Sequence, residues 1–165
     1  MTMRAIRLFG DAVLRTPTEP VTVFDAELRA LVTDLMDTLT GAPGRAGVAA
    51  PQIGVSARVF VYDADGARGH VVNPVLSGHD GEQDDEEGCL SLPGLAFPTP
   101  RAMRVTVTGA DQHGEPLRID AEGFLARAMQ HETDHLDGRL YVDTLRGDAR
   151  KQALREIRKV RPARG

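Results

Sequence analysis

Residues 121–138, AEGFLARAMQHETDHLDG, carry the strongest structural signal in this sequence. Apolar residues recur there at intervals of three and four, as they do along one face of an α-helix. These apolar positions are Phe124, Leu125, Ala128, Met129 and Leu136. Gly138 follows the last of them and is a natural left-handed stop. The stretch therefore predicts a helix that ends near Gly138.

The same helix contains the pattern H-E-x-x-H at residues 131–135. His131 and His135 are one helical turn apart, so both rings project from one face and can bind the same metal ion. Glu132 lies one position further round, where it can act on a water molecule at the ion. A catalytic metal ion usually has three protein ligands and one open position. The pattern also arises by chance, and two surface histidines on a helix are the alternative interpretation.

Cys89 is the best candidate for the third ligand. It is the only cysteine of the chain and lies in EEGCLSLPG (86–94), which is punctuated by glycine and proline and predicted to be a loop. A single cysteine forms no internal disulfide, which leaves a buried apolar residue, a nucleophile or a metal ligand. Thiolate is a soft ligand, and Gly88 allows the backbone to approach closely.

Other candidates for the third ligand are weaker. The histidine that metzincins place six residues after the second one is Tyr141 here. Glu156 lies in a basic segment, which is a poor setting for a ligand. The remaining histidines are His70, His79 and His113, and their positions beside turns predict exposure to solvent.

Composition predicts one soluble domain over residues 1–165. The chain has a mass of 17.8 kDa, 41% hydrophobic residues and 27% charged residues, which are ordinary values for a globular protein. No stretch approaches the ~18 apolar residues of a membrane span. Arg4, Arg7 and Asp11 interrupt any secretory apolar segment at the N-terminus. Together with the lone cysteine, these features predict a cytoplasmic protein without membrane contact.

Charge is distributed unevenly along the chain. Residues 80–87, DGEQDDEE, hold six acids, and residues 146–165 hold eight lysines and arginines. The acidic run is predicted to be solvated surface. The C-terminal segment, residues 147–165, is predicted to be a basic helix and tail. It is either solvated surface or a contact for the phosphates of ribosomal RNA.

Further sequence patterns predict the other helices and strands, and together they indicate an α+β fold class. Helices are predicted over 25–40 and 147–160, and hairpins over 58–76 and 103–123. Asp25 and Asp148 are the expected helix caps. The expected architecture has antiparallel or mixed β-sheets around a central metal-binding helix, with an N-terminal helix and a C-terminal helix.

Three segments together resemble the signature segments of the peptide deformylases. They are AGVAAPQIG (46–54), EGCLSLPG (87–94) and QHETDHLDG (130–138). The opening IRLFGDAVLR (6–15) is also similar to the N-terminal segment of that family. The resemblance covers about residues 4 to 145 and is to bacterial, actinobacterial-like members with a helical C-terminus.

The resemblance implies a metal-dependent amide hydrolase. Cys89, His131 and His135 would bind one divalent ion, natively Fe²⁺, with Zn²⁺, Ni²⁺ or Co²⁺ able to replace it. Glu132 would be the general base and acid, and the Gln52 amide and the Leu90 N–H would stabilise the oxyanion. The implied substrate is the N-formylmethionyl end of nascent polypeptides, the implied product is formate, and the expected state is a monomer. Taken alone, Gln52 is more typical of a polar cap at a strand edge.

The substrate-binding residues are predicted in two groups. An apolar pocket for the methionine side chain would draw on Val48, Leu125, Ala128 and Met129, although plain core packing is the better explanation for each of them taken alone. The backbone of Ala46, Gly47 and Gly88 would bind an extended peptide as a strand. Glu87 is predicted either to brace the cysteine segment by pairing with Arg101 or to belong to the acidic surface.

Three residues depart from the family pattern, and two alternative functions remain open. Ala12 stands where the family often has proline. Arg45 stands where the family usually has glycine, so it charges the rim of the peptide groove. Arg127 interrupts a helix face that is often apolar. The alternative functions are an HExxH metallopeptidase and a catalytically silent, ribosome-associated binding module.

Overall fold

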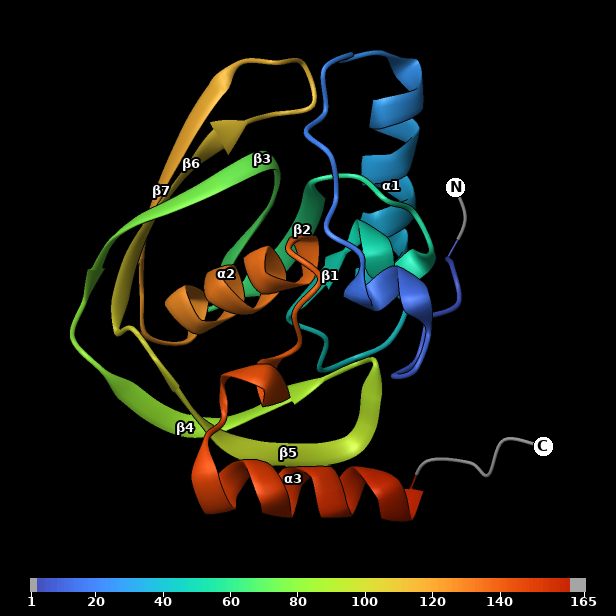
Figure 1. Ribbon diagram of the computed structural model, residues 1–165. Coiled ribbons are helices and arrows are strands. Elements are labelled where there is room, and N and C mark those ends of the chain that lie inside the picture. The colour runs from blue at the N-terminus through green and yellow to red at the C-terminus, as the bar shows by residue number, and fades with distance from the viewer. Residues whose placement is uncertain (1–2, 161–165) are drawn as a thin grey trace.

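Helix α2 (Gly123–Leu136) lies in the middle of the molecule, between a larger and a smaller β-sheet (Figure 1). The structure is a computed structural model that describes residues 3–160. Strand β7 (Pro116–Glu122) ends directly before α2. Beyond the end of α2, Gly138 adopts the left-handed conformation with φ of 74°. The helix predicted over 121–138 is therefore confirmed, and it is two residues shorter at each end.

Five antiparallel strands form the larger sheet, in the order β1-β2-β3-β6-β7. Their bounds are β1 (Gly47–Ala49), β2 (Val59–Ala64), β3 (Ala67–Asp80), β6 (Arg104–Ala110) and β7 (Pro116–Glu122). Asp65 and Gly66 join β2 to β3, and both have positive φ, as two-residue hairpin turns prefer. Both predicted hairpins are confirmed, and β3 extends beyond its predicted end.

The smaller sheet is a hairpin of β4 (Gln83–Cys89) and β5 (Leu92–Arg101). The prediction of a loop over 86–94 is therefore wrong, because only residues 90–91 form a turn. The prediction that the whole acidic run is solvated is also wrong. Gln83 and Glu87 are buried, while the three acids between them are exposed. A strand that exposes one face to solvent can carry this many acidic residues. The backbone pairing of β4 with β5 fixes its extended conformation.

Helix α1 (Ala26–Thr40) packs on β1 and β2 beside the larger sheet. Asp25 caps it as predicted, because its carboxylate accepts a hydrogen bond from the Leu28 N–H at 3.1 Å. The core between α1 and the sheet includes Leu28, Leu35, Leu39, Val48, Val59 and Val61. A second core between α2 and the sheet includes Phe60, Tyr62, Val105, Val107, Met129 and Leu136.

Helix α3 (Gly147–Val160) lies against β5 at the outside of the smaller sheet (Figure 1). Its apolar side, Ala153 and Ile157, joins Leu92 and the short helix η3 (Tyr141–Thr144) in a third core. The predicted C-terminal helix is confirmed over these residues, and positions 161–165 of the predicted tail lie outside the described residues. Asp148 lies in the first turn, because the helix already begins at Gly147.

Two more short helices, η1 (Ala12–Arg15) and η2 (Ala50–Ile53), precede β2 in the chain. The structure agrees with the predicted α+β class, with antiparallel sheets around a central helix that carries the two histidines. No helix within residues 3–160 is long and apolar enough to cross a membrane.

Candidate active site

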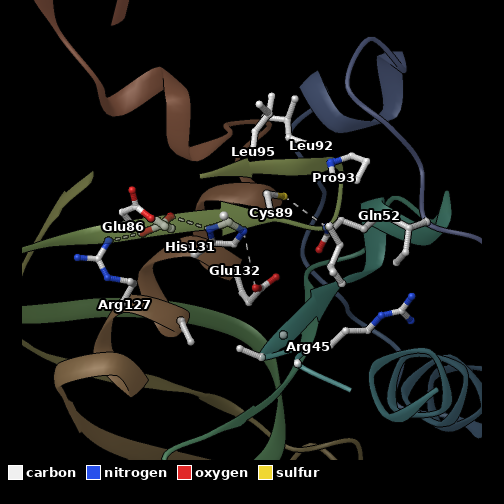
Figure 2. Close-up of a pocket in the computed structure, with 18 of the residues that line it drawn as sticks. Arg45, Gln52, Glu86, Cys89, Leu92, Pro93, Leu95, Arg127, His131 and Glu132 are labelled. Atoms are coloured by element: carbon white, nitrogen blue, oxygen red, sulfur yellow. Dashed lines mark hydrogen bonds and ion pairs between the residues drawn. The ribbon is translucent and has the colours of Figure 1, made fainter. Parts of the chain in front are cut away.

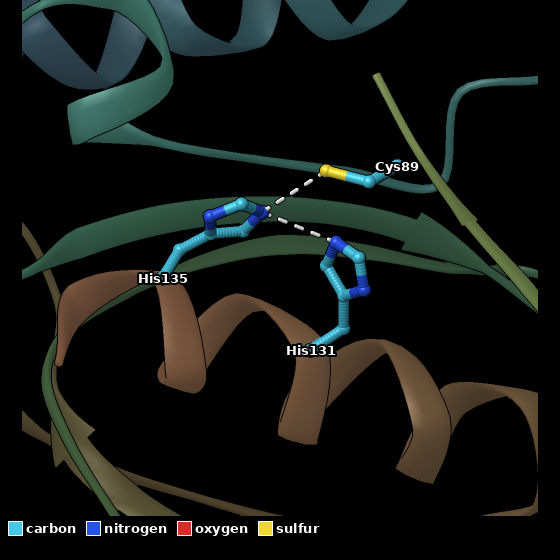
Figure 3. Close-up of side chains that lie close together, drawn as sticks. All are labelled: Cys89, His131 and His135. Atoms are coloured by element: carbon cyan, nitrogen blue, oxygen red, sulfur yellow. Dashed lines mark hydrogen bonds between the residues drawn. The ribbon is translucent and has the colours of Figure 1, made fainter. Parts of the chain in front are cut away.

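Cys89, His131 and His135 meet where the end of β4 crosses α2 (Figure 3). The Nε2 atoms of the two histidines are 3.2 Å apart, and the Cys89 Sγ lies 3.4 Å from the His135 Nε2. All three ligand atoms lie within 4.8 Å of one another. Both histidines are buried and the cysteine is half-buried. The structure thus brings Cys89 to the two histidines that the sequence places together on one helix, and the three form a candidate metal site.

These separations fit a divalent metal ion. Tetrahedral ligands at about 2.0 Å for nitrogen and 2.3 Å for sulfur lie roughly 3.3 to 3.6 Å from each other. The observed distances of 3.2 and 3.4 Å agree with that spacing. Two imidazoles and a thiolate are also donors that Zn²⁺ and Fe²⁺ accept. The donor set therefore fits a divalent metal ion.

Glu87 contacts His131, one of the three candidate metal ligands. Its Oε2 atom lies 2.7 Å from the His131 Nδ1, and a proton on Nδ1 leaves the Nε2 lone pair free for an ion. Arg101 donates to both carboxylate oxygens of Glu87, at 3.0 and 2.7 Å. Burial alone would raise the pKa of Glu87, but the hydrogen bonds with His131 and Arg101 outweigh it and hold the pKa well below its usual range. The predicted pairing of Glu87 with Arg101 is confirmed.

Arg127 is a second brace for the same carboxylate. Its Nη1 donates to the Glu87 Oε1 at 2.7 Å and to the Thr99 carbonyl at 2.8 Å. The side chain is 4% exposed, so the charge that interrupts the apolar face of α2 is paired inside the protein. Arg101 in turn binds Asp134 at 2.7 Å. Sequence reasoning assigned no partner to Arg127 or Asp134, and the only signal was a charged residue on a helix face expected to be apolar.

Gln52 is held with its amide nitrogen toward the cysteine. It lies on η2, and its Oε1 accepts a hydrogen bond from the Ala49 N–H at 3.0 Å. Its Nε2 lies 3.2 Å from the Ser91 Oγ and 3.7 Å from the Cys89 Sγ. The orientation leaves the donor end of the amide at the metal site. The sequence analysis did not single out Ser91, because its only distinguishing feature is its position two residues after Cys89.

Glu132 is buried beside the three candidate ligands, and one of its carboxylate oxygens, Oε1, has no hydrogen-bond partner among the described residues. Its Oε2 lies 4.0 Å from the His131 Nε2. Burial raises the pKa of Glu132 to about 7, against the attraction of His131. Gly47 packs directly against this carboxylate, since a β-carbon there would come within 2.6 Å of the Oε2. A buried carboxyl that titrates near neutrality is suited to general acid–base chemistry.

A cavity of about 630 Å³ opens over these groups (Figure 2). The predicted residues that line it are Ala46, Gly47, Gln52, Glu87, Gly88, Cys89, Leu90, Ala128, His131 and Glu132. Val48, Leu125 and Met129 do not line it, which corrects the predicted methionine pocket. Val48 and Met129 are fully buried in the two cores of the larger sheet, and Leu125 packs against the second of them. Phe124, which the site prediction omitted, is exposed at the cavity instead.

The structure also places Arg45 and His70, of which only His70 differs from its sequence prediction. Arg45 lines the cavity, but its guanidinium donates to the Thr38 carbonyl at the end of α1. His70 is half-buried rather than solvated, and its Nε2 accepts a hydrogen bond from the Gln112 N–H at 3.0 Å. Among residues 3–160, neither side chain forms a hydrogen bond or ion pair with Cys89, His131 or His135.

Known proteins share both the sequence and the fold. The sequence model of the family Polypeptide deformylase matches residues 3–151. A peptide deformylase of Acidothermus cellulolyticus is 58% identical over 96% of this chain and 87% of its own length. A peptide deformylase of Mycobacterium sp. (strain JLS) is 47% identical over 96% of this chain and 89% of its own length. Relatives of this kind agree with the predicted likeness to actinobacterial members.

Solved structures give the same result. The crystal structure of a peptide deformylase from Legionella pneumophila has a TM-score of 0.87 at 43% identity, over 96% of this chain and 95% of that one. The peptide deformylase from Thermus thermophilus has a TM-score of 0.89 at 41% identity, over 95% and 94%. With a matching family model, close relatives and the same fold, the chain belongs to the peptide deformylase family.

Proposed function

We propose that Cys89, His131 and His135 bind one divalent metal ion, at which the chain removes the formyl group from the initiator methionine of nascent polypeptides. The observation that carries this proposal is the convergence of three ligand atoms beside a buried carboxyl, at a cavity that Cys89, His131 and Glu132 line. Membership in the family favours this reaction over cleavage of internal peptide bonds and over a silent binding role.

Glu132 moves the proton in this scheme. A divalent ion held by Cys89, His131 and His135 would supply a nucleophile at neutral pH, because coordination lowers the pKa of water from about 15.7 towards about 7. The Glu132 carboxyl lies beside this site, with its Oε2 4.0 Å from the His131 Nε2, so it can accept a proton there. Its pKa of about 7 allows it to release the same proton to the departing amine. The products are formate and a free amino terminus.

Gln52 stabilises the negative charge that develops on the formyl oxygen. Its amide is fixed by Ala49 and directs its N–H donors at the metal site, and it carries no charge that titrates. The backbone N–H of Leu90 is proposed as the second donor, since Leu90 lines the cavity directly after Cys89. Loss of one such donor typically lowers the rate by ~10² to 10³.

The peptide binds as an added strand. β1 is the edge strand of the larger sheet and pairs with β2 on one side, so its other edge is available for main-chain hydrogen bonds. Ala46 and Gly47 line the cavity at this edge, and Gly88 lines it from β4. The methionine side chain then lies near Ala128 and Phe124, both of which also line the cavity.

The native ion is proposed to be Fe²⁺, with Zn²⁺, Ni²⁺ or Co²⁺ able to occupy the same ligands. The protein is proposed to act as a cytoplasmic monomer. α3 supports a contact with ribosomal RNA, because its exposed side carries Arg150, Lys151, Arg155 and Arg158. Replacement of the exposed Lys151, Arg155 and Arg158 by glutamate, which leaves the buried Ala153 and Ile157 in place, is expected to weaken ribosome binding while tripeptide hydrolysis is retained.

The experiment that tests the proposal compares two carboxamide variants. In Glu132→Gln the metal content is expected to stay at the wild-type level, while formate release from a formyl-Met tripeptide falls by ~10² or more. Glu122→Gln is the matched control, because Glu122 is exposed at the start of α2 and should leave both quantities unchanged. Loss of metal from Glu132→Gln, or full activity, would contradict the assigned role.

A further inference from the structure

An apolar groove of about 180 Å³ opens between the N-terminal segment, the β4–β5 turn and the end of α3. Its apolar side chains are Leu8, Phe9, Leu92, Leu95, Ile157 and Val160. Leu8 and Val160 are 50% and 56% exposed. Large apolar side chains exposed together commonly mark a binding surface.

The walls of this groove are fixed by contacts within the fold. The Phe9 N–H donates to the Ser91 carbonyl at 2.9 Å, which holds the N-terminal segment against the β4–β5 turn. Ile157 is 3% exposed and belongs to the same core as Leu92, which holds α3 against β5. A groove with three anchored walls is preformed and does not require rearrangement to bind a side chain.

The groove continues from the catalytic cavity. Leu8, Leu92, Pro93 and Leu95 line both of them. Figure 2 shows Leu92, Pro93 and Leu95 beyond Cys89, on the side away from Glu132. A peptide whose formyl group reaches the metal ligands must leave the cavity with the rest of its chain, and these shared residues form one of its walls.

We infer that the groove binds an apolar side chain of the formylated peptide itself, downstream of the methionine. This inference rests on the proposed function. An extended chain advances about 3.3 Å per residue and directs alternate side chains to the same side. One downstream position is therefore expected to prefer a leucine-like side chain, so the enzyme favours nascent chains that are apolar at that position.

Two other occupants are less suited to the groove. Residues 161–165, which follow Val160, are Arg-Pro-Ala-Arg-Gly and include no large apolar side chain. A second copy of the chain would need roughly 1,200 Å² or more of total buried surface for a stable interface. A volume of 180 Å³ accepts about one side chain and supplies no such area.

The first experiment scans the peptide with the metal-loaded protein. The substrates are formyl-Met pentapeptides of glycine, in which one leucine or one serine is placed at position 2, 3, 4 or 5. We expect kcat/KM for formate release to be about five- to tenfold higher for leucine than for serine at one position. Equal values at every position would overturn the inference while leaving the proposed function intact, and absence of formate from every peptide would overturn the proposed function itself.

The second experiment assigns the preference to the groove. Val160→Asp places a charge on the groove wall and is expected to remove most of the leucine preference, without changing hydrolysis of formyl-Met-Gly-Gly. Val23→Asp is the matched control, because Val23 is 62% exposed and does not line the groove. A preference that survives Val160→Asp as fully as Val23→Asp would overturn the assignment. A preference that arises only after removal of residues 161–165 would also overturn it, since the tail would then occupy the groove.

Discussion

Replacing Glu87 by glutamine is expected to destabilise the fold and weaken the metal site together. Glutamine keeps the shape of the side chain but removes the negative charge that Arg101, Arg127 and His131 all contact, at distances of 2.7 to 3.0 Å. The side chains of Arg101 and Glu87 are 6% and 4% exposed. Breaking a buried charge pair from one side costs about 3 to 5 kcal/mol, which is a large part of the 5 to 15 kcal/mol that stabilises an ordinary domain.

The cost is expected at the low end of that range. Arg101 keeps its hydrogen bond to Asp134 and Arg127 keeps the one to the Thr99 carbonyl, so neither cation is left without a partner. We therefore expect a loss of about 3 kcal/mol in the free energy of unfolding. At a urea dependence of about 2 kcal/mol per molar, the midpoint of unfolding moves down by roughly 1.5 M.

The assay is urea unfolding of the metal-free protein, followed by circular dichroism, and a metal titration of the folded protein. Metal affinity is expected to fall by about 10- to 100-fold, because the His131 ring is then oriented by a neutral amide instead of a carboxylate. Glu86→Gln is the matched control, since Glu86 is the neighbouring carboxylate and is exposed. An unfolding free energy for Glu87→Gln within 0.5 kcal/mol of the wild type, on the order of an exposed substitution, would refute the reasoning.

Three more predictions follow from the same geometry. Gly47→Ala is expected to lower turnover by at least about tenfold with metal content unchanged, because its β-carbon would come within 2.6 Å of the Glu132 Oε2; unaltered turnover would contradict this packing. Gln52→Ala is expected to lower kcat by ~10² to 10³ in formate release, and a change confined to KM would contradict its role in the transition state. Burial lowers the pKa of His70 despite the attraction of Asp111, so the unfolded chain binds a proton more readily. The free energy of unfolding should therefore fall as pH drops below about 6.5, and His70→Gln should show a weaker fall in denaturant titrations across that range.

Local patterns predicted the elements that are stabilised by short-range contacts. The helix over 25–40 has a cap, an apolar stripe and a stop within one stretch of sequence, and the structure contains it as α1. The hairpin of β2 and β3 turns at Asp65 and Gly66, where the chain offers residues that tolerate positive φ. The two histidines could be placed on one helix face because a single helical turn separates them.

The arrangement of β4 and β5 could not be predicted in the same way. Glycine, proline and a run of acids are typical of a loop. The two strands that form instead are adjacent in sequence, from Gln83 opposite Arg101 to Cys89 opposite Leu92, and they pack against η3 and α3, which local composition does not reveal. The brace of Glu87 by Arg127 joins residues 40 positions apart, so no local pattern encodes it. For the same reason, the sequence could not decide whether Val48 and Met129 lie in the core or in the methionine pocket.

The central claim is that one metal ion at Cys89, His131 and His135 is required for release of formate. The most direct measurement titrates metal-free protein with Fe²⁺ under anaerobic conditions, and records bound iron and formate release from a formyl-Met tripeptide in the same samples. The account predicts that activity rises in proportion to bound iron and saturates at one ion per chain. Formate release by the metal-free protein, or no release at one bound ion per chain, would contradict it.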